Sequence, residues 1–489
     1  MTSATTPAPS PHSSPPLPAS VRRGYGLGSV ATGSFGTVPG LLLLPYLTDR
    51  LGVPAAAAGV IVFAPKAWDV VLNPVAGRIS DRSTHPDGRR RPFLIRAGLL
   101  LAAAFALLFL GPTSPQWLAA GWVAVAYLAC ATAYSFFQVP YVAMPAEITD
   151  DYDERTRLMT WRVAILALAI LVSGGASPAI RDALGPDWGY RAVGFFVAAL
   201  IALGAWAAWR GTRSARVVTG VATSATFGDQ LRIIRSDRPF RLLLTTFVLQ
   251  ALATGAMLAG VDYVARWIIG TPLSATLLFV CFVAPALVVT PLWQRFGTAR
   301  DKKTGYVIAS VLLGGGALAL VLLRSLPEAA VYACVAVVGI GYAGAQMFPL
   351  AMLADVASRT AEARTRVGLY TGVWTAGETL GLALGPAAYA GVLALGGYES
   401  SGAGWVAVQG DRTLTAIALG FSLVPAVLVA VSLLALRTFT LAPPSAGSMY
   451  LRGPGAARIH RPEGGSSSGS RTRSSTGTTD DEIDDEDER

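Results

Sequence analysis

Long apolar stretches separated by short polar loops make up most of the chain. A helix needs roughly 20 apolar residues to cross about 30 Å of hydrocarbon, and such stretches recur throughout the sequence. They cover residues 25–47, a second run that starts at 54 and ends in a basic loop, and then 93–111, 117–145, 160–180, 190–209, 242–268, 272–294, 304–323, 329–353, 367–395 and 413–436. The pattern predicts an all-α polytopic membrane protein with twelve transmembrane helices.

The longest polar interruption, residues 210–241, is predicted to be a cytoplasmic linker. It divides the chain into two halves, 24–209 and 242–438, with six predicted helices each. Residues 1–23 are rich in Pro, Ser and Thr, and residues 439–489 are rich in Gly, Ser and Arg and end in an acidic block. Such segments bury too little apolar surface to fold, so both are predicted to be disordered cytoplasmic tails.

A short motif recurs in the two halves. Residues 143–147 (AMPAE) lie at the end of the fourth predicted helix, and residues 351–355 (AMLAD) lie at the equivalent place in the second half. An Arg-Thr-Arg sequence follows each of them. Two halves repeated in the same orientation form carriers whose substrate site lies between them at the middle of the membrane. The repeat therefore indicates transport.

Basic residues gather in alternate loops. With both termini in the cytoplasm, arginine-rich loops such as 89–91 and 210–238 lie inside, whereas the outer loops hold isolated arginines. This is the positive-inside pattern of multi-pass membrane proteins, and the plasma membrane is the predicted location. The composition agrees, because 53% of the residues are hydrophobic and only 14% are charged, unlike in a soluble globular domain.

Several function classes find no support in the sequence. The three histidines lie in tails or in a loop, so neither a histidine-based triad nor a metal cluster is expected. No G-x-x-x-x-G-K-[ST] phosphate loop occurs, and the arginine-rich loop suits membrane topology better than nucleic acid. We expect a monomer that is no enzyme and holds no cofactor or metal.

Charged side chains inside the apolar stretches are costly, and they usually face a protein interior or a water-filled path. Lys66 and Asp69 share one helix face, either as a pair that neutralises itself or as part of a transport path. Glu378 lies deep in the eleventh predicted helix, where burial disfavours the ionised form and suits proton coupling. Asp262 lies four residues before Arg266, which predicts an ordinary ion pair along one helix.

The sequences WDVVLNPVAGRISDR at residues 68–82 and GRRRPF at 88–93 resemble the signature of a known transporter family. It is the glycoside-pentoside-hexuronide:cation symporter family of the major facilitator superfamily, which includes melibiose permease. The basic motif is also similar to that of sucrose transporters. The resemblance continues through residues 147–162 and 354–374 and so covers both halves. It implies the major facilitator fold, a sugar or glycoside substrate and a coupling ion, H⁺ or Na⁺.

The resemblance carries over to single positions. Asp69 matches a carboxylate that helps to bind the coupling cation, Lys66 matches a nearby basic position, and Arg162 matches the family arginine of the fifth helix.

Other positions depart from the family pattern. Asn73 stands where a second aspartate is usual, and Glu378 stands where a lysine is common. Gln138 and Gly33 replace two aspartates of melibiose permease. A sodium site requires several oxygen ligands, so the missing carboxylates disfavour sodium as the coupling ion. Proton coupling, or transport without coupling, is then favoured over sodium coupling.

The sequence therefore predicts three groups of functional residues. The cation-coupling group is Asp69, Glu378 and Asn73. The substrate-binding group is Lys66, Gln138, Arg162, Trp374 and Ser135. The cytoplasmic gating group consists of charged residues that would pair and separate during transport, namely Asp81, Arg82, Arg89, Arg90, Arg91, Glu147, Arg155, Asp355 and Arg364.

The predicted function is secondary active transport by alternating access, with import of a sugar or glycoside and a proton favoured over sodium as the coupling ion. The partners would be a small-molecule substrate and the lipid bilayer, not nucleic acid. One alternative is a major facilitator exporter of a drug, lipid or small metabolite, since a fold does not determine the substrate. Another is a non-transporting receptor or scaffold, against which the buried charges argue.

Overall fold

A computed structural model describes residues 17–86, 88–149, 151–215, 237–271, 273–357, 367–402 and 405–439. Most of the predicted tails, most of the linker between the halves and Arg364 lie outside these residues. In the described part of the chain, regular structure is helical apart from an isolated bridge between Gly402 and Trp405. The predicted all-α class is confirmed.

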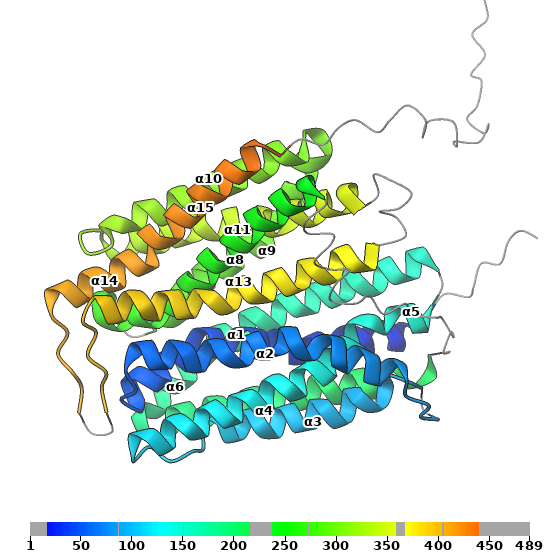
Figure 1. Cartoon of the computed structure of the whole chain (residues 1–489), viewed down its shortest axis with the longest axis horizontal. Coiled ribbons are helices and arrows are strands. Elements are labelled where there is room, and N and C mark those ends of the chain that lie inside the picture. The colour runs from blue at the N-terminus through cyan, green and yellow to red at the C-terminus, as the bar shows by residue number, and fades with distance from the viewer. Residues whose placement is uncertain are drawn as a thin grey trace, which may run out of the picture. The chain divides into compact units, whose positions relative to one another are not determined.

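Each predicted apolar run lies on one or two of the helices in Figure 1. The first half contains α1 (Ala19–Pro45) with the π turn η1 (Tyr46–Arg50), α2 (Ala55–Asp81), α3 (Arg91–Leu108), α4 (Gln116–Ala143), the one-turn α5 (Pro145–Ile148), α6 (Tyr152–Gly211) and η2 (Thr212–Ser214). The second half contains α8 (Arg238–Val264) with the π turn η3 (Ala265–Ile269), α9 (Ser274–Ala299), α10 (Lys302–Ala319) with η4 (Leu320–Leu322), α11 (Glu328–Ala357), α13 (Val367–Leu395), α14 (Asp411–Phe421) and α15 (Leu423–Arg437).

Eleven helical segments of the described chain are long and apolar enough to cross a membrane, and the one along α6 has 58 residues. A straight helix of that length would reach roughly 87 Å, almost three times the hydrocarbon thickness. The helix is interrupted at Gly185, whose φ of 72° glycine adopts without strain. The two arms fold back on each other, because Trp161 and Gly211 from opposite ends both lie against the first turns of α1. α6 therefore crosses twice, which gives the predicted twelve spans.

The last predicted run, 413–436, is not one continuous helix. Ser422 has φ −118° and ψ −68° and separates α14 from α15. Its Oγ donates to the carbonyl of Ala418 at 2.6 Å, and such bonds back onto the preceding turn often bend helices. The apolar pattern continues through this break and so does not reveal it.

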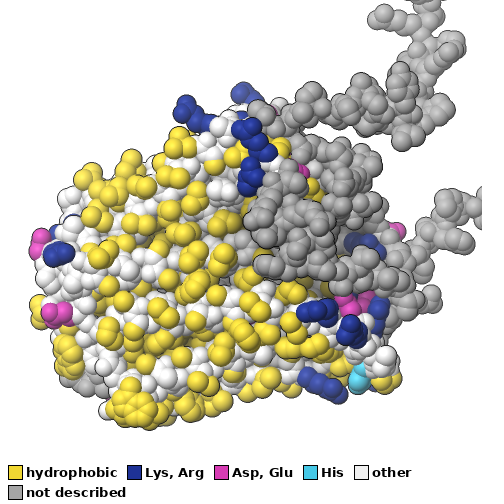
Figure 2. Space-filling view, in the orientation of Figure 1, with side chains coloured by type: hydrophobic (Ala, Val, Ile, Leu, Met, Phe, Trp, Pro, Cys, Tyr) yellow, Lys and Arg dark blue, Asp and Glu magenta, His cyan; other side chains and the backbone are white. Residues whose placement is uncertain are grey.

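The helices pack most closely within each half. α1 packs on α6 and α2 on α4 in the first half, and α8 packs on α13 and α10 on α11 in the second. The halves meet where α2 packs on α13, α6 on α9 and α1 on α8. Figure 2 shows apolar side chains covering the visible face between two charged ends, as contact with lipid requires. We call the end with the loop 82–90 the arginine end, and the end with the α13–α14 loop, residues 396–410, the hairpin end.

Candidate functional site

Asp69 lies within the apolar helix α2, and only 2% of its surface is exposed. Ser135 of the neighbouring α4 donates its hydroxyl hydrogen to Asp69 Oδ1 at 3.1 Å. One hydroxyl donor leaves other lone pairs of the carboxylate available for a proton or a cation. Asn73, one turn further along α2, is partly buried. Two residues predicted for different roles, Asp69 and Ser135, are therefore in direct contact.

The ammonium of Lys66 lies over aromatic rings. Its Nζ is 4.5 Å from the ring centre of Phe35 and 5.5 Å from that of Tyr134, which are cation–π distances. Lys66 and Asp69 act on each other electrostatically, but these two described residues form no ion pair within 4 Å. Lys66 and Asp69 thus interact at longer range and not as a contact ion pair.

Arg162 reaches from the first arm of α6 toward α4. Its guanidinium carbon is 5.7 Å from the ring centre of Tyr141, and its Nε is buried without a hydrogen-bond partner, as is Oε1 of Gln138. Among the described residues, no carboxylate is within ion-pair distance of Arg162. Buried polar atoms without partners are rare in folded proteins and mark places where a ligand or water completes the site.

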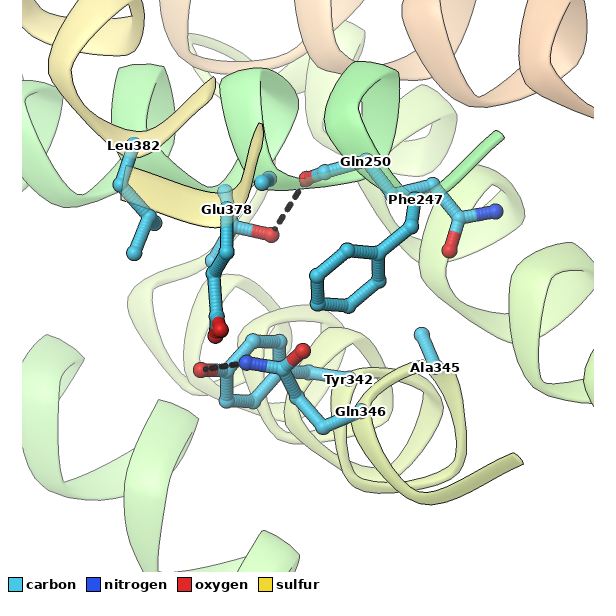
Figure 3. Close-up of a pocket in the computed structure, with 9 residues that line it drawn as sticks. Phe247, Gln250, Tyr342, Ala345, Gln346, Glu378 and Leu382 are labelled. Atoms are coloured by element: carbon cyan, nitrogen blue, oxygen red, sulfur yellow. Dashed lines mark hydrogen bonds between the residues drawn. The ribbon is translucent and has the colours of Figure 1, made fainter. Parts of the chain in front are cut away.

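Glu378 of α13 points toward α11 (Figure 3). Its carboxylate faces Tyr342 and Gln346. Gln346 Nε2 donates to the hydroxyl of Tyr342 at 2.9 Å. The cavity beside these groups leaves about 10 Å³ for the centre of a water molecule, enough for roughly one water. A buried carboxyl with a water-sized space beside it is suited to take up and release a proton.

Tyr134 of α4 connects the two predicted clusters. It lies within electrostatic range of Asp69 and Arg162 in the first half and of Glu378 in the second. From the sequence, Tyr134 is one of the aromatic residues near the candidate polar positions that could stack on the apolar face of a sugar ring. It shares a helix face with Gln138 at the spacing i, i+4. Tyr134 is therefore near predicted residues of both halves.

Trp374 is placed differently from the other predicted substrate residues. It is 1% exposed, and its ring stacks on Phe247 of α8 with ring centres 4.3 Å apart. Its Nε1 is buried without a hydrogen-bond partner. One face of Trp374 is thus occupied by packing within the second half, and its role toward substrate stays a prediction.

At the arginine end, Arg90 joins two predicted gating carboxylates. It lies 2.7 Å from Asp81 and 3.2 Å from Glu147, and Arg89 lies 3.5 Å from Glu147. Burial raises the pKa of Glu147 above its usual range, while Arg90 and Arg89 oppose that shift. Arg91 instead donates to the carbonyl of Trp209 at 3.1 Å. The charges of the arginine motif therefore hold α2, α5 and α3 together.

The repeated motif makes equivalent contacts in the two halves. Glu147 contacts the basic residues before α3, and Asp355 contacts Lys302 at the start of α10, at 2.7 Å. The sequence paired these carboxylates with Arg155 and Arg364. Arg155 donates to the carbonyl of Thr149 at 2.8 Å, and Arg364 lies outside the described residues. Lys302 was missed because its partner lies 53 positions along the chain. Arg82, the remaining member of the predicted gating group, is exposed.

A second cavity, of about 190 Å³, lies at the arginine end between α1 and α6. It is lined by Arg22, Arg23, Arg157 and Trp161, with Ala19 at its edge. Glu154 lies 3.4 Å from Arg22 and 2.9 Å from Arg157. The three arginines outnumber this carboxylate, so the mouth of the cavity carries positive charge that attracts anions.

Comparison with known proteins places this geometry among transporters. The family model described as MFS/sugar transport protein matches residues 24–442. The inner membrane symporter YicJ of Escherichia coli is 24% identical over 86% of this chain and 91% of that protein. The glucuronide carrier protein homolog of Escherichia coli is 26% identical over 82% of this chain and 88% of its own length. A solved D-xylose-proton symporter shares the fold, with a TM-score of 0.63 at 13% identity over 88% of this chain and 98% of that chain.

Proposed function

The chain belongs to the MFS/sugar transport protein family, and from this premise we propose that it is a proton-coupled symporter of a sugar or glycoside that carries a negative charge. It would act in the plasma membrane by alternating access, with the arginine end toward the cytoplasm as the positive-inside rule requires. The similarity to a glucuronide carrier homolog supports an acidic sugar as the class of substrate.

The observation that carries this proposal is the state of the two cations. Lys66 lies over aromatic rings, and Arg162 lies beside Tyr141 with a buried Nε that has no partner. A charge inside a membrane protein is normally paired or exposed to a water-filled path. An arginine presents a planar fork of donors that matches a carboxylate with two parallel hydrogen bonds. A carboxylated sugar would supply the missing acceptor.

Charge balance provides a reason for coupling. When Asp69 and Glu378 are both ionised, their charges cancel those of Lys66 and Arg162. A proton on one carboxylate leaves a net charge of +1, which the charge of a monoanionic substrate then neutralises. Proton and substrate therefore favour each other's binding. The loaded site is then uncharged while the carrier changes the side to which it is open. An empty site with two cations and two carboxylates is also neutral, so the carrier can return.

Uptake into proteoliposomes tests the proposal. Purified protein would be given a radiolabelled glucuronide or the matching neutral glucoside, under an imposed pH gradient, a sodium gradient or neither. We expect accumulation of the glucuronide with the pH gradient alone. Accumulation only with sodium would overturn the coupling ion, equal uptake of both sugars would overturn the charge of the substrate, and the absence of uptake would favour an exporter.

Asp69→Asn separates coupling from binding. An asparagine cannot take up the proton, so we expect loss of accumulation while exchange of labelled for unlabelled glucuronide continues. Asp411→Asn is the matched control, because the side chain of Asp411 is 81% exposed at the hairpin end and pairs with Arg324 of the same half. Intact accumulation in Asp69→Asn would show that the coupling site lies elsewhere.

A further inference from the structure

A cluster of four charged side chains joins the two halves at the hairpin end. Asp49 of η1 and Arg181 of α6 come from the first half, and Asp262 of α8 and Arg266 of η3 come from the second. The side chains of Asp49 and Asp262 are 2% and 1% exposed. We propose that these four residues form a latch that holds the hairpin end shut, and that this latch opens and re-forms in each transport cycle.

Contacts in the latch run across the halves in both directions. Arg181 pairs with Asp262, and Arg266 pairs with Asp49 at 3.0 Å. Arg266 also lies 3.3 Å from Asp262, which is the ion pair along one helix that the sequence predicts. The sequence interpretation was therefore incomplete, because the other partner of Asp262 comes from the opposite half. Each half contributes one aspartate and one arginine, so the cluster is neutral as a whole.

The internal repeat places the two central parts of the latch at equivalent positions. α1 and α8 are the first helices of the two halves, and each ends in a five-residue π turn, η1 and η3. π turns are rare and occur frequently at functional sites. Asp49 lies in η1 and Arg266 lies in η3, so the pair between them joins two equivalent elements.

The hairpin loop of the second half closes over the cluster. Tyr398 donates its hydroxyl hydrogen to Asp49 and accepts a hydrogen bond from Nε1 of Trp267 at 3.0 Å. Burial and the neighbouring Asp49 raise the pKa of Tyr398, so the phenol stays a donor to Asp49. Ser400 donates to the carbonyl of Val53 at 2.8 Å. Tyr398 and Ser400 thus tie this loop of the second half to the first half by two hydrogen bonds.

A cluster of this kind has two stable states and unstable intermediates. When the hairpin end is shut, every buried charge of the latch has a partner of opposite sign. When the hairpin end is open, water hydrates all four groups. Removal of one partner leaves an uncompensated buried charge, which is strongly destabilising. Packed interfaces of this kind switch between discrete arrangements rather than deform gradually.

The arginine end differs in this respect. The ion pairs that join described residues there, such as Arg90 with Glu147 and Lys302 with Asp355, link elements of the same half. The described ion pairs that cross between the halves lie at the hairpin end. The structure therefore corresponds to the state in which the hairpin end is shut.

Spin-label distances across the hairpin end test the latch. Ser114 of the first half and Ser325 of the second are exposed and suit replacement by labelled cysteine, after Cys130, Cys281 and Cys334 have been changed to alanine. In lipid nanodiscs we expect a single distance for the parent, which is the short distance of the shut state relative to the open one. Asp49→Asn and Asp262→Asn should each shift most of the population to a longer distance, because each removes an ion pair between the halves and leaves the four-residue cluster with two arginines and one aspartate in the shut state.

Asp187→Asn is the matched control. Asp187 lies at the same end and pairs with Arg50 of its own half at 2.8 Å, so its loss should leave the distance unchanged. The double variant Asp49→Asn with Arg266→Gln removes both charges of one pair, keeps Arg181 with Asp262 and leaves the cluster neutral, so it should restore the short distance and guards against misfolding of the single variants. Unchanged distances in both Asp49→Asn and Asp262→Asn would overturn the proposal. The measurement needs no substrate, so its outcome is independent of the sugar and the coupling ion.

Discussion

At the scale of the residue, charged side chains of the site do not form contact pairs with the opposite charges that are nearest to them in sequence. Lys66 is three positions from Asp69, yet its ammonium lies over Phe35, and Asp69 accepts its hydrogen bond from Ser135 instead. A cation held by an aromatic ring keeps its charge available, because a ring attracts a cation more weakly than a carboxylate does. The arrangement leaves Lys66 and Arg162 able to bind an anionic group.

Arg162→Lys tests whether the guanidinium recognises that group. Lysine keeps the charge but replaces a planar fork with a point charge, so a bidentate contact is lost. Hydrogen bonds to charged groups contribute about 1.5–3 kcal/mol, so we expect KM for a glucuronide to rise roughly ten- to hundredfold. KM for the neutral glucoside should change little.

Arg300→Lys serves as the control, because Arg300 is exposed at the arginine end. Kinetic measurement of uptake at several concentrations of each sugar gives KM for the parent and the variants. Equal effects of Arg162→Lys on both sugars would mean that Arg162 does not contact the acidic group.

At the scale of the element, hydrophobic periodicity was enough to predict the spans, because lipid demands an apolar surface along each of them. The same pattern could not reveal breaks within a span. Ser422 interrupts the last run although the sequence around it stays apolar, and the first and seventh runs extend into the π turns η1 and η3 without a signal that marks them. Backbone detail of this kind arises from packing, which a one-dimensional pattern does not contain.

The partners of the charged residues also fall into those that the local sequence predicts and those that depend on the fold. Contacts along one helix, such as Asp262 with Arg266, were predictable from spacing. Contacts between helices, such as Asp355 with Lys302 or Asp262 with Arg181, were not. The sequence therefore identified which midplane residues are unusual, whereas the latch at the hairpin end required the fold.

Gly185→Ala tests the turn that divides α6 into two spans. Gly185 has φ 72°, and a Cβ at this position would meet no atom within 4 Å, so any cost comes from the backbone alone. With ψ −176° this residue occupies a backbone region that is essentially restricted to glycine and costs other residues about 1–3 kcal/mol, so we expect a lower midpoint of thermal unfolding in detergent. Gly391→Ala, in α13 and equally unobstructed, should be neutral or raise the midpoint, since alanine favours helix by about 1 kcal/mol. If the Gly185→Ala protein were as stable as the Gly391→Ala protein, Gly185 would not have the backbone conformation that divides α6 into two spans.

At the scale of the whole molecule, the two halves contact each other toward the hairpin end through small residues as well as through the latch. Gly174 of α6 lies against Phe279 of α9, which is 1% exposed. Next to it, Thr276 donates to the carbonyl of Gly175 at 3.0 Å. Small residues allow the helices of the two halves to approach closely in this region. Charge pairing and close packing therefore stabilise the same shut state by independent means.

Gly174→Ala separates these two contributions, because it adds bulk without changing charge. A Cβ at Gly174 would clash with the ring of Phe279, whereas one at Gly175 would be 3.4 Å from Val280, an ordinary contact. Overpacking costs about 1–3 kcal/mol, enough to shift a two-state equilibrium roughly ten- to hundredfold. With spin labels at 114 and 325, Gly174→Ala should therefore lengthen the distance as Asp49→Asn does, and Gly175→Ala should not. If Phe279→Leu restores the short distance in the Gly174→Ala protein, the steric cause is established. If the adjacent glycine variants behave alike, the close approach of Gly174 to Phe279 does not stabilise the shut state.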